Sequence, residues 1–165
     1  MTDVVDGAVT IRLRVNDIDH EVTVEARELL IDVLRKRLAL TGAKVGCETT
    51  SCGACTVLLD GRSVKSCTVL AVQAQSRDIR TIEGVADGDE LHPVQEAFRR
   101  CHGLQCGFCT PGMVMAAISL IDEGRAVDER SVRTALKGNL CRCTGYQNIV
   151  AAVLSAAVEM EGGRT

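Results

Sequence analysis

Eight of the nine cysteines in this chain of 165 residues fall into two sets of four with short internal spacings. Thiolates are soft ligands, which proteins use to hold zinc, copper(I) or iron–sulfur clusters. Four is also the number of cysteines that a tetrahedral zinc site or a [2Fe–2S] cluster takes. Two metal centres are therefore predicted. The first set is Cys47, Cys52, Cys55 and Cys67, and the second set is Cys106, Cys109, Cys141 and Cys143.

The first set has the spacing C-x4-C-x2-C, followed by a fourth cysteine after eleven intervening residues. This is the plant-type spacing for the ligands of a [2Fe–2S] cluster, and it is unusual for zinc. Gly46 and Gly53 lie beside these cysteines. They allow the loop to wrap closely and to aim backbone N–H groups at sulfur, which helps to set the reduction potential. The spacing therefore favours an iron–sulfur cluster in a loop.

The second set combines C-x2-C with C-x-C, each at a predicted helix start. Pro111 suits the beginning of one helix, and Thr144-x-x-Gln147 resembles a capping box for another. The partial positive charge of a helix N-terminus favours an anionic thiolate centre. Structural zinc sites also use such pairs, so zinc is the alternative for this set. Two centres in one chain favour an electron relay, and loss of the second centre is expected to unfold the helical part because its ligands come from two helix starts.

The elements predicted before residue 83 form a small sheet on one helix. Alternating residues in 9–15 and 22–24 indicate a hairpin, and Leu30, Val33, Leu34 and Leu38 have helical spacing, with Gly42 as a stop. Asp60-Gly61 predicts a second hairpin between "TVLL" and "RSVKS", and residues 78–82 a further strand.

Everything after Glu83 is predicted to be helical. Helices are expected behind Pro93, over 113–121, near Val132 and after Thr144. We therefore expect two domains, residues 1–82 with the first set and residues 83–165 with the second. The ninth cysteine, Cys101, lies on an apolar stripe and is expected to be a buried small hydrophobic residue.

The remaining sequence argues against other classes of function. The net charge is −3 and no block of basic residues occurs, so the sequence predicts no basic surface for binding nucleic acid. No dinucleotide-binding motif, P-loop or nucleophile arrangement occurs, which indicates a chain that carries electrons and does not turn over substrate. No apolar run is long enough for a transmembrane segment, and the start has no secretory pattern. A cytoplasmic location is expected, where nine cysteines stay reduced.

Four motifs spanning nearly the whole chain carry a resemblance to a known family: "GCETTSCGACTV", "SVKSC", "GLQCGFCTPGM" and "GNLCRCTGYQNIV". The chain resembles the small [2Fe–2S] subunit of the molybdenum hydroxylases, the xanthine dehydrogenase family. The likeness is greatest to the small subunit of carbon monoxide dehydrogenase and related bacterial three-subunit enzymes. No ligand position departs from the family pattern.

The resemblance implies an α+β fold, with a β-grasp plant-type ferredoxin domain followed by a four-helix bundle. It implies two partners, a large subunit with molybdopterin cytosine dinucleotide and a medium subunit with FAD, in a heterohexamer of two three-subunit halves. Electrons would pass from molybdenum through the second and then the first [2Fe–2S] cluster to FAD. Gln105 and Cys143 would lie against the pterin, so that Cys143 serves both as a ligand and as a contact to the molybdenum cofactor.

Two other functions stay open at this point. A free-standing two-cluster ferredoxin would use the same eight ligands but would not need Gln105 or the glycine-flanked Cys143. A zinc-stabilised scaffold would contain no iron. The substrate of the complex is a property of the large subunit and is not predicted from this chain.

Overall fold

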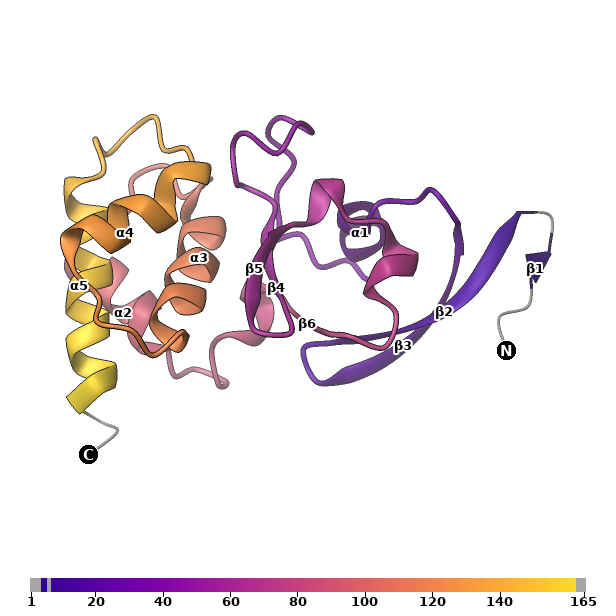
Figure 1. Cartoon of the computed structure of the whole chain (residues 1–165), viewed down its shortest axis with the longest axis horizontal. Coiled ribbons are helices and arrows are strands. Elements are labelled where there is room, and N and C mark those ends of the chain that lie inside the picture. Colours follow the sequence, from indigo (N-terminus) through magenta and orange to yellow (C-terminus); the bar gives the residue numbers. More distant parts are fainter. Residues whose placement is uncertain (1–3, 6, 163–165) are drawn as a thin grey trace.

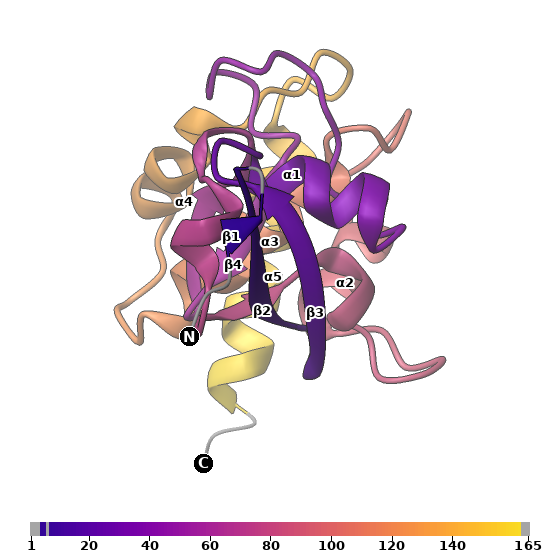
Figure 2. The ribbon, with the colours of Figure 1, turned by 90° about the vertical axis from the view of Figure 1, so that its right-hand side faces the viewer.

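The computed structural model describes residues 4–5 and 7–162. A β part and a helical part lie side by side along the long axis of the molecule, and β4 and β5 stand between them (Figure 1). Figure 2 looks onto the β2–β3 hairpin, with the helices behind it. The α+β fold predicted from the sequence is confirmed.

The β part is built on a sheet of six strands in the order β1-β2-β6-β4-β5, with β3 paired to the other side of β2. Only β2 and β6 run parallel. The predicted hairpin between β4 and β5 is present, and Asp60 and Gly61 turn it with φ of 51° and 77°. The strands are β1 Val4–Val5, β2 Ala8–Val15, β3 Ile18–Glu25, β4 Thr56–Leu59, β5 Arg62–Lys65 and β6 Asp78–Arg80.

One short helix packs on this sheet, as the sequence predicts. It begins as α1, Leu30–Asp32, and continues as the wider π-helical turn η1, Val33–Arg37. Its apolar side chains and those of β2, β4 and β6 form one core. Two short 3-10 turns, η2 Ser66–Thr68 and η3 Ala71–Ala74, lie between β5 and β6, and a third, η4 Ile82–Gly84, follows β6.

The prediction that Gly42 stops this helix is wrong. The helix ends at Leu38, and Ala39 reverses the chain with a φ of 57°. Gly42 is instead a close-contact position, because a Cβ there would lie 2.2 Å from Ile82 Cγ2. Its backbone N–H also donates to Glu83 Oε1 at 2.7 Å.

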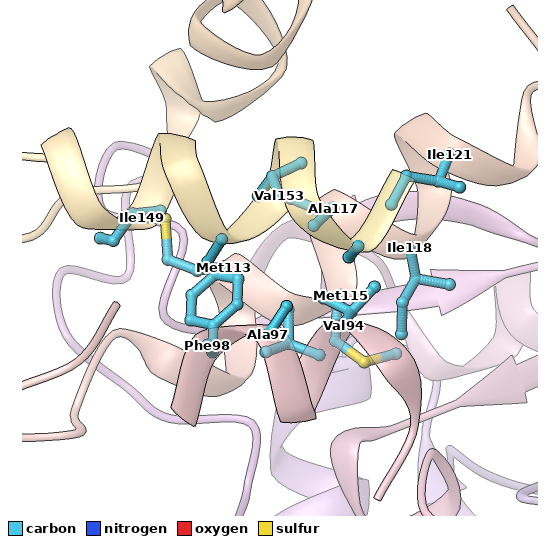
Figure 3. Close-up of a cluster of buried hydrophobic side chains, with 14 of the residues drawn as sticks. Val94, Ala97, Phe98, Met113, Met115, Ala117, Ile118, Ile121, Ile149 and Val153 are labelled. Carbon is cyan, nitrogen blue, oxygen red and sulfur yellow. The ribbon is translucent and has the colours of Figure 1, made fainter. Parts of the chain in front are cut away.

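The helical part contains four helices around one apolar core (Figure 3). Pro93 begins the first, as predicted, and His92 Nδ1 accepts from Val94 N at 3.2 Å to cap it. The core includes Met113 and Met115, and the thiol of Cys101 packs against it, partly buried. The helices are α2 Pro93–Arg100, α3 Thr110–Asp122, α4 Glu129–Ala135 and α5 Gln147–Gly162, with the 3-10 turn η5 Leu136–Gly138 after α4.

Strand β4 belongs to both cores. Successive side chains of a strand point to opposite faces. Val57 and Leu59 accordingly enter the core of the β part, whereas Leu58 enters the core of the helical part. Ser63 N of β5 also donates to Ser119 Oγ of α3 at 3.0 Å. Helix α3 thus covers the outer face of the sheet and fixes the two parts to each other.

Within residues 4–5 and 7–162, no helix is both long enough and apolar enough to cross a membrane.

Candidate metal centres

The loop before β4 curls around the first set. Glu48, Thr50 and Gly53 have φ of 55°, 64° and 70°, which bends the backbone back on itself. The sulfur of Cys47 accepts backbone hydrogen bonds from Thr49 N at 3.4 Å and Cys52 N at 3.3 Å. This is the arrangement that the sequence predicts, with N–H groups aimed at sulfur. Hydrogen bonds, first from Thr49 and then from Cys52, lower the pKa of Cys47 to about 6.

The other half of the first set is buried. Cys55 and Cys67 are 2% and 5% exposed and pack together with Ile31. Ser66 ties their two segments together, because its Oγ donates to Cys55 O at 2.7 Å. Burial raises the pKa of Cys55 to about 11. Electrostatic interactions link Cys52 to both Cys47 and Cys67, so the fold brings all four thiols of the set into one neighbourhood.

The second set is gathered from the two loops that precede α3 and α5. Cys106 Sγ and Cys143 Sγ lie 3.6 Å apart, and both residues are exposed. Cys109 caps α3 and is partly buried, and burial, followed by the interaction with Cys141, raises its pKa to about 12. The two pairs of cysteines predicted to form this set therefore meet, although 31 residues lie between Cys109 and Cys141.

The predicted capping box at α5 is wrong. The helix begins at Gln147, after Gly145 and Tyr146 turn the chain with φ of 65° and 69°. These two residues move Thr144 out of the cap position. Its Oγ1 accepts from Tyr146 N at 3.2 Å and donates to Cys141 Sγ at 3.2 Å. Thr144 therefore donates a hydrogen bond to a sulfur of the second set.

Two side chains hold the cysteine loops through hydrogen bonds that the sequence does not predict. The hydroxyl of Tyr146 accepts from Cys141 N at 2.8 Å and donates to Asn139 O at 3.4 Å. The guanidinium of Arg35 donates to the carbonyls of Thr41 and Ala43, both at 2.7 Å, at the entry to the first loop. Neither contact follows from a sequence motif, because each depends on how its loop turns.

The two sets stand back to back across one junction. Leu140 N donates to Cys52 O at 2.8 Å, which joins the neighbour of Cys141 directly to a member of the first set. A Cβ on Gly53 would lie 2.3 Å from Gly138 O, so the backbones touch there. The loops of residues 43–55 and 139–146 accordingly lie along the same edge of the molecule, at the top of Figure 1 and Figure 2.

Both sets fit [2Fe–2S] clusters. Each offers four thiols, and Thr110 Oγ1, next to Cys109, is buried without any hydrogen-bond partner in the structure, so a sulfur acceptor at the second set would satisfy it. In the part of the chain that the structure describes, no three His, Cys, Asp or Glu residues converge on the position of a single metal ion. A [2Fe–2S] cluster takes four thiolates, shared between two irons, which is the number that each set offers. When bound, such clusters supply one-electron transfer.

Known proteins agree with this geometry. A family model described as "2Fe-2S iron-sulfur cluster binding domain" matches residues 13–81, and one described as "[2Fe-2S] binding domain" matches residues 81–154. The β subunit of the 6-hydroxypseudooxynicotine dehydrogenase complex of Paenarthrobacter nicotinovorans is 51% identical over 91% of this chain and 94% of that protein. The chain belongs to the small iron–sulfur subunits of the molybdenum hydroxylases.

Solved structures of molybdenum hydroxylases contain the same fold. Quinoline 2-oxidoreductase from Pseudomonas putida 86 has a chain that matches with a TM-score of 0.90 and 42% identity, over 97% of this chain and 100% of that chain. The aldehyde oxidoreductase from Desulfovibrio desulfuricans matches with a TM-score of 0.88 and 43% identity, over 93% of this chain but only 17% of that longer chain.

Membership of the molybdenum hydroxylases confirms the predicted class of function. The chain is a [2Fe–2S] electron-transfer subunit of an oxidoreductase and is not the subunit that turns over substrate. It has two [2Fe–2S]-binding domains, as the two sets of cysteines predict. The greater likeness to the carbon monoxide dehydrogenase branch stays a prediction.

Proposed function

We propose that this chain relays electrons between a large molybdopterin-binding subunit and a medium FAD-binding subunit, and that its eight paired cysteines hold the two clusters. The observation that carries the proposal is the back-to-back arrangement of two four-thiol sets, joined by the bond from Leu140 N to Cys52 O at 2.8 Å. Electron transfer needs closely spaced centres on a rigid frame, and the shared strand β4 supplies that frame.

The second set is the side that we assign to the molybdenum cofactor. Cys106 and Cys143 are exposed, and a Cβ on Gly107 or Gly145 would meet no atom within 4 Å. A cofactor can therefore approach this backbone closely. Gln105 is also exposed, beside Cys106, and its amide can both donate and accept hydrogen bonds. We assign Gln105 and Cys143 to contact with the pterin of molybdopterin cytosine dinucleotide.

The related proteins support an assembly with partner subunits. The small subunit of the pseudooxynicotine enzyme is a separate chain, whereas the matching part of the Desulfovibrio aldehyde oxidoreductase is 17% of one longer chain. We propose separate large and medium subunits here, in a heterohexamer of two three-subunit halves. The related proteins are named for different substrates, which supports a substrate pocket on the partner and not on this chain.

We place the domain boundary at residue 82, so that residues 1–82 hold the first cluster and residues 83–165 the second. The two family models meet at residue 81, which supports this division. We also place the protein in the cytoplasm, where its nine cysteines would stay reduced.

The test is metal analysis and low-temperature EPR on the dithionite-reduced protein, purified with whatever co-elutes. We expect four irons per chain, no zinc, two distinct [2Fe–2S] signals, and molybdenum and flavin in the same peak. Zinc in place of iron, or one signal with four alkylatable cysteines, would overturn the assignment. A lone chain with two clusters would instead identify a free-standing ferredoxin.

Two cysteine variants make the ligand assignment specific. C109A should lose the second EPR signal and two irons, because it removes a proposed ligand. C101A should keep all four irons, because Cys101 packs against the helical core and belongs to neither set.

A further inference from the structure

Lys65 lies between the two sets of cysteines. It stands on β5, directly across the ladder from Thr56 of β4. Its Nζ donates to Thr56 Oγ1 at 2.9 Å and to Asn139 Oδ1 at 2.8 Å. Thr56 directly follows Cys55, and Asn139 precedes Cys141 by two residues. One ammonium group therefore bonds to the strand behind the first set and to the loop that carries half of the second set.

The surroundings of this ammonium contain thiols but no paired carboxylate. Lys65 is half-buried, and none of the ion pairs in residues 4–5 and 7–162 involves it. Cys67 follows Lys65 by two residues, and Cys55 precedes the residue that faces Lys65 across the ladder. A buried charge is costly unless an opposite charge lies near it. The first set is the source of that opposite charge.

The ammonium is also held in place from several sides. Asn139 is 2% exposed, and its Nδ2 donates to Gly53 O at 3.2 Å and to Thr56 Oγ1 at 3.3 Å, so its Oδ1 has a fixed direction. A Cβ on Gly138 would lie 3.6 Å from Lys65 Nζ, which shows that the head group packs against this backbone. A charge fixed in this way keeps its effect, whereas a mobile surface lysine is screened by water.

We propose that Lys65 is a positioning residue whose fixed positive charge raises the reduction potential of the first centre. This inference rests on the proposed assignment of the first set as cluster ligands. Reduction adds one electron, delivered by the partner subunit that holds the molybdenum cofactor, and no bond forms or breaks in this chain. The centre thereby becomes more negative by one charge. A nearby cation stabilises the more negative state more strongly, so reduction becomes more favourable.

The effect belongs mainly to the first centre. Lys65 lies two residues before Cys67 and opposite the neighbour of Cys55, whereas it reaches the second set only through Asn139, two residues from Cys141. Lys65 therefore raises the potential of the first centre relative to that of the second. This change favours electron transfer from the second centre to the first.

The experiment is an EPR-monitored redox titration of both centres in the full chain, purified with its partner subunits. Three variants separate charge from shape: K65Q keeps a hydrogen-bond donor without the charge, K65M removes both, and K65R keeps the charge. K65Q and K65M should each lower the equilibrium constant for reduction of the first centre about tenfold, which is about 59 mV for a one-electron couple. K65R should keep a potential close to that of the unmodified protein.

Lys36 provides the matched control. It is a 72% exposed lysine paired with Asp32 at 2.8 Å, so K36M removes the same charge from a screened position and should leave both potentials unchanged. Unchanged potentials in K65Q and K65M would overturn the proposal. So would equal shifts of both centres, because these would indicate a general change in packing.

Loss of the first cluster from any of the three Lys65 variants would also test the proposal. Loss from K65Q and K65M but not from K65R would support a need for the charge beside the four thiolates. Loss from all three would overturn the proposal, since shape alone would then matter. The unmodified protein tests the proposed function separately, because it must show two [2Fe–2S] signals before the variants are compared.

Discussion

The eight thiols have different surroundings, although the sequence presents them as two similar sets. Hydrogen bonds from Thr49 and Cys52 lower the pKa of Cys47 to about 6, while burial raises the pKa of Cys55 to about 11 and that of Cys109 to about 12. At neutral pH the metal-free protein therefore has a thiolate at Cys47 and neutral thiols at the buried Cys55 and the partly buried Cys109. A metal must displace the protons of those two thiols.

We predict that Cys47 is alkylated first by iodoacetamide in metal-free protein at pH 7, and that Cys55 and Cys109 react last. The thiolate is the reactive form, and the thiols of Cys55 and Cys109 stay protonated. Because cluster binding releases their protons, it should become more favourable as the pH rises from 7 to 9. Mass spectrometry of peptides gives the order of alkylation, and reconstitution across that pH range gives the affinity. Faster reaction of Cys109 than of Cys47 would contradict this ranking.

A single hydroxyl is expected to tune the second centre. Thr110 Oγ1 is buried and has no hydrogen-bond partner in the protein. With a sulfur acceptor present, its hydrogen bond would stabilise the reduced centre by about 1 kcal/mol. T110V, which keeps the shape, should therefore lower the potential of the second centre alone. An EPR-monitored redox titration measures this potential. T134V, a substitution at an exposed threonine, is the control. Equal potentials in T110V and the unmodified protein would show that the hydroxyl does not reach sulfur.

At the scale of elements, the positions of the cysteines depend on loops that touch each other. Gly53 lies in the first loop with a φ of 70°, and a Cβ there would lie 2.3 Å from Gly138 O. Gly61, in the β4–β5 turn, has a φ of 77°, but a Cβ there would meet no atom within 4 Å. A side chain at either position would strain the left-handed backbone, but only at Gly53 would it also collide with Gly138.

We predict different outcomes for the two alanine variants. G61A should cost about 1 kcal/mol of stability, which is the usual penalty for a left-handed residue with a side chain. G53A should cost more and should also separate the loops, because the backbone at Gly138 must move and the bond from Leu140 N to Cys52 O must lengthen. Thermal unfolding measures the first effect, and loss of magnetic coupling between the reduced centres in EPR measures the second. Equal behaviour of the two variants would mean that the junction is not rigid.

At the scale of the whole molecule, the two parts are expected to unfold together. Leu58 is 4% exposed and extends from a strand of the β part into the helical core. L58A should therefore cost about 2–5 kcal/mol and lower the unfolding temperature of both parts at once. V158A removes a side chain that is 71% exposed, and it should change stability by less than about 0.5 kcal/mol. Two separate transitions in the L58A melt would contradict this prediction.

Removal of the clusters should have a local effect. The ligand positions alone suggest that the helical part unfolds without metal. The buried side chains of the helical core, however, come mostly from α2, α3, α4 and α5, and the cysteine loops add only residues that are partly buried, among them Cys109, Cys141 and Tyr146. We therefore expect chelated protein to keep its helical circular dichroism, with faster hydrogen exchange in residues 101–110 and 139–147. Loss of the helical circular dichroism would instead show that the helical part unfolds without its cluster.

The sequence determined the chemistry of this protein because cysteine spacing constrains local geometry. Cys47, Cys52 and Cys55 lie within nine residues, so one curled loop brings them together, and the glycines beside them permit the curl. Periodicity likewise predicted the hairpins, the helix before the first loop and the helical second half. The helix-end signals failed at Gly42 and at Thr144, because the chain already reverses at Ala39 and turns at Tyr146.

Only the tertiary structure decided how the two sets face each other. Lys65 and Asn139 are separated by more than seventy residues, and neither belongs to a motif that indicates contact, yet they meet at 2.8 Å. The same holds for Leu140 and Cys52. Such contacts arise because α3 packs on β4 and brings the end of η5 against the first loop. Residue spacing determines which side chains a loop can gather, whereas the packing of distant elements determines which loops meet.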